Sequence, residues 1–216
     1  MPTRSQRAIC QEVADGATAL GGLDVSDCDW SGLNLDGLDL GGANLGNVNL
    51  TNATLSNFNL DGVNLAGARL DGAVLTDGSI GGGDLTGVSA VGVRLVRVHF
   101  AGAVMPNANF SSASIVDGSF TYAMAQMINL QGSVVTGVNF NDANISGANL
   151  RNSNLAGTEF WRTIATGVTI DQAQVQLVVF GQTILTGATG TPIAADMATY
   201  FGTTCPDGSV RDAPCW

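Results

Sequence analysis

The hydrophobic residues of this chain recur at every fifth position. The stretch DLGGANLGNVNLTNATLSNFNLDGVNLAGARL, residues 39–70, has a leucine at each fifth residue from Leu40 to Leu70. A small or apolar residue stands two positions before each leucine, and Asn or Asp stands directly before most of them. A period of five fits neither the 3.6-residue period of an α-helix nor the two-residue period of a strand. It indicates a chain that runs briefly extended, turns a corner and runs again, with one large side chain pointing inward on each side.

The same phase continues through most of the chain. Counting in fives from Val25 to Leu185 gives 33 central positions, of which 30 are Leu, Ile, Val, Met, Phe or Trp, and no insertion breaks the count. Gly, Asn and Asp dominate the second position after each centre in the regular stretch, and these residues tolerate tight turns and left-handed backbone. Four such sides make one square coil, a period of about 20 residues that is typical of solenoids. We therefore expect an all-β solenoid of about eight coils, on the order of 40 Å long at the usual strand spacing.

Side-chain size supports this coil length independently. Centres that are four repeats apart would stack, and the column that begins with Leu40, Leu60 and Ile80 continues with five aromatic residues: Phe100, Phe120, Phe140, Phe160 and Phe180. Rings at the strand spacing can pack on one another. We predict that this column is a ladder of core rings rather than an aromatic binding site.

Short helices are expected to cover both open ends, because a solenoid end exposes apolar surface and unpaired strand edges. Residues 4–15 allow an N-terminal helix with Ile9 and Val13 on one side. A second helix is predicted from Thr191-Pro192 to about residue 201, with Pro at the first helical position. Its apolar face would cover the last coil or form a homodimer contact through residues 191–202.

The predicted organisation has three parts: a helical cap at residues 1–22, a β-helix at residues 23–188, and a helix with a cysteine-bearing tail at residues 189–216. Four cysteines lie in the two end segments and none lies between them. We predict the disulfides Cys10–Cys28 and Cys205–Cys215, which would staple the ends and would persist only in an oxidising compartment. The alternative is four reduced thiols, with Cys28 filling a core position.

The repeated A-(N/D)-L-x-G unit, from about Leu23 to Leu185, resembles the pentapeptide-repeat family. The resemblance implies a right-handed quadrilateral β-helix. The tail TTCPDG is similar to the tails of exported members of the family, and SDCDWSGLNL resembles the CDLSGANL-type start of many of them, although Val25 replaces their companion cysteine. These similarities favour an extracytoplasmic mature protein that has lost its signal, since the polar opening MPTRSQRAIC is not itself a secretory signal.

Composition excludes several classes of function. The net charge is −10, with 18 acidic residues, 8 arginines and no lysine, so direct nucleic-acid binding through phosphates is not expected. No apolar run approaches the roughly 18 to 20 residues that span a bilayer. His99 is the one histidine, and no Cys, His and Asp cluster has metal-ligand spacing. We expect no enzymatic activity, no metal and no cofactor.

The charge is concentrated in the N-terminal half. Residues 21–90 carry a net charge of −8 and residues 91–190 a net charge of zero. An acidic binding face is one interpretation, and turn-forming Asp and Asn on a hydrated surface is the other. The candidate residues for such a face are Asp24, Asp29, Asp36, Asp39, Asp61, Asp71 and Asp84.

The middle of the repeat region departs most from the consensus. Cationic, aromatic and thioether side chains replace the usual polar residues there, and exposed Met and Tyr on a repeat scaffold can mark a contact surface. Neutral drift in a tolerant scaffold is the alternative. The candidate contact patch consists of Arg94, Arg97, His99, Tyr122, Met124 and Met127, with Trp161 and Arg162 as a second patch.

Two functions remain. The first is a non-enzymatic structural or protein-interaction scaffold with an unknown protein partner. The second is implied by the resemblance to family members that protect DNA gyrase from quinolones or natural toxins: a cytoplasmic DNA mimic that binds DNA gyrase or topoisomerase IV, with an acidic rod in place of duplex DNA.

Overall fold

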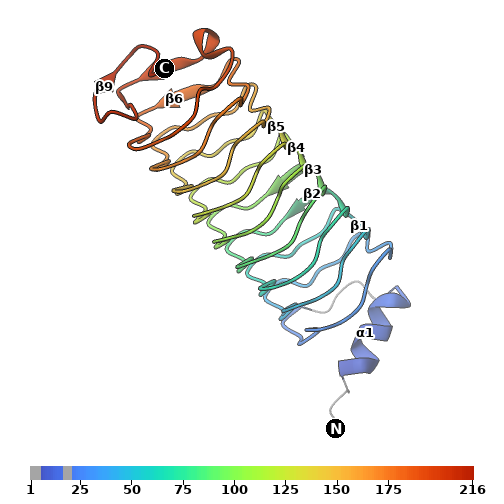
Figure 1. Ribbon diagram of the computed structural model, residues 1–216. Coiled ribbons are helices and arrows are strands. Elements are labelled where there is room, and N and C mark those ends of the chain that lie inside the picture. The colour runs from blue at the N-terminus through green and yellow to red at the C-terminus, as the bar shows by residue number, and fades with distance from the viewer. Residues whose placement is uncertain (1–5, 17–20) are drawn as a thin grey trace.

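The computed structural model describes residues 6–16 and 21–216. Stacked square coils form a rod, with helix α1 at its N-terminal end and the C-terminal segment at the other (Figure 1). The elements are α1 (Gln6–Ala14), β1 (Thr54–Ser56), β2 (Val74–Ser79), β3 (Arg94–His99), β4 (Ser114–Val116), β5 (Val134–Thr136), β6 (Val179–Gly181), the 3-10 helix η1 (Ala195–Met197), β7 (Thr199–Phe201), β8 (Thr203–Thr204) and β9 (Val210–Arg211).

Each coil has four walls, which we name by the ladder of backbone bridges along each wall. Wall A is bridged from Asp24 to Thr204, wall B from Asp29 to Thr189, wall C from Asn34 to Ile193 and wall D from Asp39 to Thr199. All these pairings are parallel, and those of wall A join residues 24, 44, 64, 84, 104, 124, 144, 164, 184 and 204. The predicted quadrilateral β-helix and its coil length are confirmed. Strands β1 to β5 pair along wall C and form one parallel sheet in that order, and β2 and β3 continue around the corner onto wall D.

The corners depend on left-handed backbone at the second residue after each centre. Asn47 and Asn52 have φ angles of 58° and 59° there, and Gly42 and Gly62 have 69° and 66°. Asn and Gly are the residues that adopt this conformation at least cost. The repeated Gly, Asn and Asp therefore fix the square shape of each coil.

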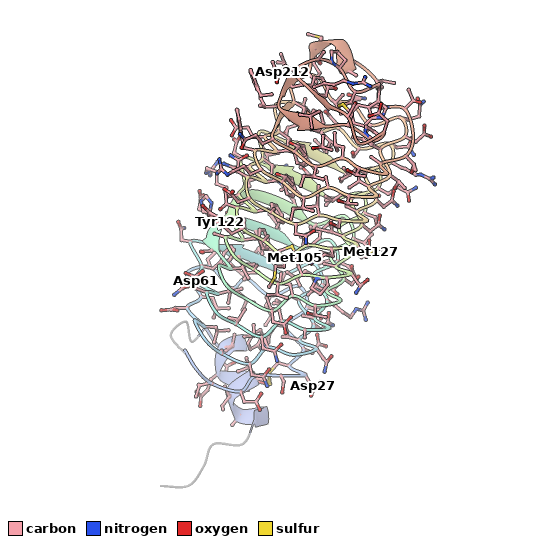
Figure 2. The ribbon with its side chains drawn as sticks, turned by 90° about the vertical axis from the view of Figure 1, so that its left-hand side faces the viewer. Asp27, Asp61, Met105, Tyr122, Met127 and Asp212 are labelled. Atoms are coloured by element: carbon pink, nitrogen blue, oxygen red, sulfur yellow. A yellow bond between two sulfur atoms is a disulfide. The ribbon has the colours of Figure 1, made fainter. Side chains whose placement is uncertain are left out.

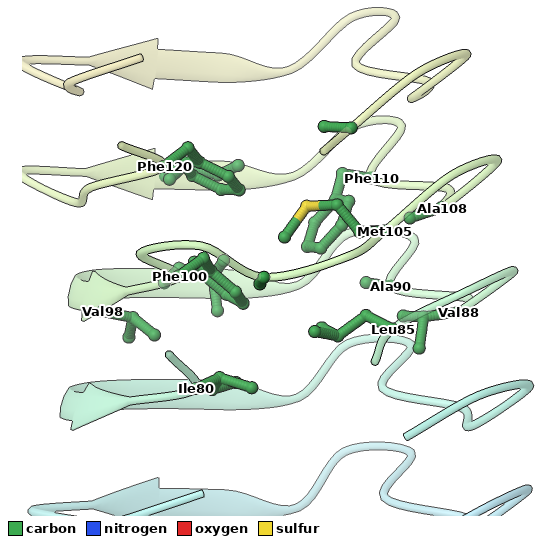
Figure 3. Packing of buried hydrophobic residues seen from close by; sticks show 14 of the residues in the cluster. Ile80, Leu85, Val88, Ala90, Val98, Phe100, Met105, Ala108, Phe110 and Phe120 are labelled. Carbon is green, nitrogen blue, oxygen red and sulfur yellow. The ribbon is translucent and has the colours of Figure 1, made fainter. Parts of the chain in front are cut away.

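The phenylalanine column lies in the core as a continuous stack behind wall D. Ring centroids are 4.7 Å apart between Phe100 and Phe120 and 5.5 Å apart between Phe160 and Phe180, with nearly parallel rings. Phe110, from wall B, meets Phe100 and Phe120 edge-on (Figure 3). The core is therefore filled by stacked side chains of like size from successive coils.

The helix predicted from Thr191 to about residue 201 is wrong for most of its length. Only Ala195–Met197 form a 3-10 turn, and the next residues form β7, which pairs in parallel with β6. Tyr200 is buried and stacks on Phe180 at 5.3 Å, so it continues the aromatic column. Backbone pairing and burial in this last coil outweigh the local helix signal. The homodimer contact predicted at residues 191–202 has no such helix to carry it.

The C-terminal end is covered by the tail instead. β8 and β9 form an antiparallel hairpin, and the Cys205–Cys215 disulfide closes it with a Cα–Cα distance of 5.2 Å. Trp216 lies against Phe180 with ring centroids 6.1 Å apart. The tail therefore does the covering that was assigned to a helix.

The N-terminal end is covered by α1, as predicted, although residues 4 and 5 of the predicted helix lie outside the described residues. Ile9 and Val13 are buried against the first coil. The Cys10–Cys28 disulfide joins the helix to that coil with a Cα–Cα distance of 5.6 Å, and the Trp30 indole N–H donates to the Cys10 carbonyl at 3.1 Å. Both predicted disulfides are confirmed. Among the described residues no helix is long and apolar enough to cross a membrane.

Replacing Phe140 with Ala should destabilise the middle of the rod. The substitution removes a buried ring that stacks on Phe120 and Phe160, and such a cavity costs about 3–5 kcal/mol. Because each coil contacts only its neighbours, amide hydrogen exchange should accelerate most in the stretch from Ile115 to Ala165. Val134→Ala, an exposed change on wall C, is the control and should alter exchange little. Uniform acceleration along the rod would contradict the nearest-neighbour explanation.

Candidate interaction surfaces

The acidic residues singled out in the sequence lie on three walls and at three corners rather than on one face. Asp24 and Asp84 lie on wall A, Asp29 on wall B and Asp39 on wall D. The other three lie at the corners that follow walls B, C and D: Asp71, Asp36 and Asp61. The structure therefore gives a rod whose N-terminal half is acidic all round.

Most of these carboxylates also hold the turns together. Asp24 accepts from the Ser26 backbone N–H and hydroxyl and, at 3.0 Å, from the Asn44 side-chain amide of the next coil. Asp39 makes the same two kinds of contact, with Gly41 and Asn59. These are turn contacts typical of Asp and Asn, joined into ladders between coils.

At two of these turns the hydrogen bonds shift the pKa of the carboxyl group. Donation from Ser26, first from its hydroxyl, lowers the pKa of Asp24, and donation from Ser31 lowers the pKa of Asp29. A hydrogen bond to the charged form always acts in this direction. The turn role and the surface charge are thus properties of the same groups.

The cationic members of the predicted contact patch lie on β3 and around one corner. Arg94 lies on wall C, Arg97 at the corner between walls C and D, and His99 on wall D. The Arg97 guanidinium pairs with both carboxylate oxygens of Asp77 at 2.6 and 2.8 Å. A shallow groove of about 410 Å³ lies beside this pair, lined by Phe58, Asp77, Gly78, Ser79, Arg97 and His99.

The groove depends on an unusual pair of side chains in two successive coils, a large one followed by a glycine. Phe58 stands where the repeat usually has a small residue, and Gly78 follows one coil later. A Cβ atom at position 78 would overlap the Phe58 ring. The glycine therefore gives the ring its place in the wall.

The aromatic and thioether members of the patch lie elsewhere, on wall A. Tyr122 is at the corner between walls D and A, Met124 in the middle of wall A, and Met127 at the corner between walls A and B. Tyr122 and Met127 lie at opposite edges of the rod (Figure 2). The exposed fractions of Tyr122, Met124 and Met127 are 66%, 47% and 59%. The predicted single patch is thus two groups on different walls.

Wall A also carries two exposed apolar residues that the sequence reasoning missed. Ile164 and Ile184 belong to the same bridged column as Met124, and both are exposed. Aligning the residue before each centre from coil to coil would have found them, because the column then reads Val104, Met124, Asn144, Ile164 and Ile184.

The second predicted patch is partly a stack of rings. Trp161 and Phe201 are two coils apart in sequence, yet their centroids are 5.5 Å apart and the rings are nearly parallel. They meet because Gly181 stands between them, where a Cβ would overlap the Trp161 ring. This stack holds the last coils together at the corner between walls D and A.

Arg162 takes part in an ion pair at the corner between walls D and A. Its guanidinium binds both oxygens of Asp142 at 2.6 Å. This contact, with a smaller contribution from the Tyr122 hydroxyl, lowers the pKa of Asp142. Asp142 and Arg162 together therefore add no net charge to the corner between walls D and A.

Residues 6–16 and 21–216 contain no candidate metal centre. No three His, Cys, Asp or Glu side chains gather there in an arrangement that could hold a metal ion. The groove beside Arg97 is lined by His99, by the Asp77–Arg97 ion pair and by Ser79, whose hydroxyl donates to the Asp61 carboxylate.

One family matches the sequence of this chain. The family described as "Pentapeptide repeats" matches in eight copies, within residues 18–52, 39–77, 53–89, 119–155 and 143–182, which is more than half of the chain. No curated protein matches the sequence.

Two solved structures of QnrB1, described as a plasmid-mediated fluoroquinolone resistance protein, have a similar fold. One has a TM-score of 0.64 at 19% identity and covers 81% of this chain and 90% of its own. The other has a TM-score of 0.61 at 21% identity and covers 73% and 82%. Identities this low show a shared fold and nothing further.

Removing the guanidinium of Arg162 should release the carboxyl group of Asp142. In Arg162→Gln the pKa of Asp142 should rise toward its ordinary value, measured by carboxyl carbon NMR during a pH titration. Gln182, one coil later, adopts the same left-handed backbone, so Gln fits the site. A lowered folded-state pKa stabilises the protein above the unfolded-state pKa, and that stability is lost as the pH falls through the folded-state pKa.

Arg97→Gln is the matched control, because it should raise the pKa of Asp77 and leave Asp142 unchanged. An unchanged Asp142 pKa in Arg162→Gln would show that this ion pair does not form in solution.

Proposed function

Since the chain belongs to the pentapeptide-repeat family, we propose that it is a non-enzymatic scaffold whose outer walls bind a protein partner. The observation that carries this proposal is the exposure of large apolar side chains at outer positions where the repeat normally has polar residues, above all Tyr122, Met124 and Met127. Such residues add nothing to the core, and a contiguous apolar patch on a soluble protein is typical of a contact surface.

The working compartment proposed for this scaffold is an oxidising one outside the cytosol. Its support is that all four described cysteines are paired in two disulfides, one at each end of the rod. Disulfides that staple exposed ends are stable where thiols are not kept reduced.

A second candidate, a DNA mimic that binds DNA gyrase or topoisomerase IV, is favoured by the acidic N-terminal half. Residues 21–90 carry a net charge of −8 over three and a half coils, about 17 Å of rod. Duplex DNA carries about 10 phosphate charges over the same length. The match ends there, because residues 91–190 have no net charge. Only a piece as long as about five base pairs resembles DNA electrostatically, which is why the scaffold is placed first.

Photo-crosslinking from each wall of one coil tests the scaffold. A photoreactive benzoylphenylalanine would replace Met124, Asn129, Val134 or Asn139 in turn, which are successive bridged residues on walls A, B, C and D. In cells of the source organism, a scaffold with a partner should give a discrete crosslinked product from at least one wall and none from others. Absence of any discrete product from all four folded variants would refute the proposal.

A DNA supercoiling assay with gyrase, with and without a fluoroquinolone, tests the second candidate. If the acidic half acts as a DNA mimic, micromolar protein should inhibit supercoiling or relieve drug inhibition. The triple variant Asp24→Asn, Asp29→Asn and Asp39→Asn should weaken the effect at least tenfold. Asn already occupies the bridged positions 44, 49 and 59, so the fold tolerates it there. If the parent protein has no effect on supercoiling or on drug inhibition, this candidate is eliminated.

A further inference from the structure

We propose that wall A binds an amphipathic helix of a protein partner, with the apolar stripe of that helix on residues 104–187 and basic residues at the end that faces residues 24–87. The proposal rests on the scaffold function above and specifies its surface and the chemistry of its partner.

Four of the five middle residues in the C-terminal half of wall A are apolar, and Asn144 is the exception. Met124, Ile164 and Ile184 have exposed fractions of 47%, 40% and 38%, and they are aligned in one bridged column. At the A–B corner Met127 lies over Gly147, where a Cβ would overlap its sulfur atom, so the apolar surface continues around that corner.

The fold does not require these side chains. In the same column Asn44 and Asn144 accept hydrogen bonds from the backbone N–H groups of Gly46 and Ser146, two positions further along the chain. Met124, Ile164 and Ile184 have no side-chain acceptor for that bond. They are exposed and do not fill the core, so they forgo a turn contact without gaining burial within the chain.

Charge divides the wall into two halves. From Val104 to Gly187 its middle column and its A–B corner contain no charged residue. The only charged residues at the D–A corner beside this half are Asp142 and Arg162, which neutralise each other. The N-terminal half carries four carboxylates and no cation: Asp24, Asp27, Asp61 and Asp84. Asp27 and Asp61 lie at the two edges of the same half of the rod (Figure 2).

The spacing of the wall favours a helix as the ligand. Successive side chains in the column are one coil apart, about 4.8 Å. An apolar stripe on an α-helix recurs every three to four residues, a rise of about 5 Å. An extended strand repeats its side chains on one face at about 6.7 Å, which falls out of step. The four steps from Val104 to Ile184 span about 19 Å, the length of about 13 helical residues.

The charge pattern selects against two other occupants. A second copy packed along the full wall would place carboxylates against carboxylates in a parallel pair, or against apolar residues in an antiparallel one, and both cost free energy. An anionic membrane surface would repel the acidic half. A helix with a basic end uses both halves of the wall.

The binding test uses a synthetic amphipathic peptide of about 20 residues, with a leucine stripe over about 13 residues to match the apolar half and four arginines at one end. Titrated into isotopically labelled full-length protein, it should shift the amide NMR signals of residues 104–187 and, in a salt-sensitive way, those near Asp61 and Asp84, which a helix of about 30 Å reaches. A peptide with glutamates in place of the arginines should bind at least tenfold more weakly at low salt. Shifts confined to another wall, or no binding, would overturn the proposal.

Substitutions that the repeat itself tolerates make the control. The triple variant Met124→Asn, Ile164→Asn and Ile184→Asn should bind the peptide at least tenfold more weakly, because it removes the exposed apolar side chains of wall A. The fold should tolerate these changes, because Asn already occupies positions 44, 64 and 144 of the same column. Val134→Asn on wall C, whose bridged neighbour is Asn154, should leave affinity within twofold. Three results would contradict the proposal that wall A binds a helix. They are an equal loss of affinity in both variants, self-association that the triple variant abolishes, and binding of neutral or anionic lipid vesicles in place of the peptide.

The crosslinking experiment separates the two levels of the hypothesis. Products from wall B, C or D but not from Met124 would leave the scaffold standing and overturn the assignment to wall A. No product from any wall would refute both.

Discussion

The structure depends on one constraint: every coil must repeat the backbone bridges of the coil before it on four walls at once. Each wall is narrow, and a bridge such as Asp24 to Asn44 joins only one residue of each coil to the next. No single bridge could hold the chain, so register is maintained by all four walls and by the stacked core between them. A one-residue error on one side would displace the corner and expose a core residue at the next side. This explains why the fifth-residue count from Val25 to Leu185 has no insertion.

That constraint also decides what could be predicted from sequence. The coil length, the corners and the aromatic column follow from a pattern repeated at every level of the rod, so local ambiguity averages out. The segment from Thr191 to Phe201 could not be read in this way. Its Thr-Pro start is a helix signal, whereas its true determinant is Tyr200, which falls one coil after Phe180 and stacks on it. The aromatic series ends there in a different residue type, and local propensity gave the opposite answer.

The surfaces were predictable only in part, because outer positions are free of the core constraint. The sequence placed an excess of carboxylates in residues 21–90 but left open whether they form one face, and the structure distributes them all round the rod. Each wall receives one repeat in four, so acids scattered in sequence are distributed around the rod. The proposed contact patch was divided for the same reason: Arg97 and Met127 are one and a half coils apart in sequence, which places them at opposite corners.

The two halves of the rod differ in net charge, and this difference limits how the rod can act. A DNA mimic needs negative charge around and along the rod, and here the net charge falls to zero after about residue 90. A docking scaffold needs one wall to differ from the others, and wall A does so in the neutral half. The Asp ladders cannot by themselves distinguish the two functions, since the same carboxylates form turn contacts in either case. Met124, Ile164 and Ile184 can distinguish the two functions. Their side chains accept no turn hydrogen bond and do not fill the core, and a DNA mimic would gain nothing from an uncharged apolar row.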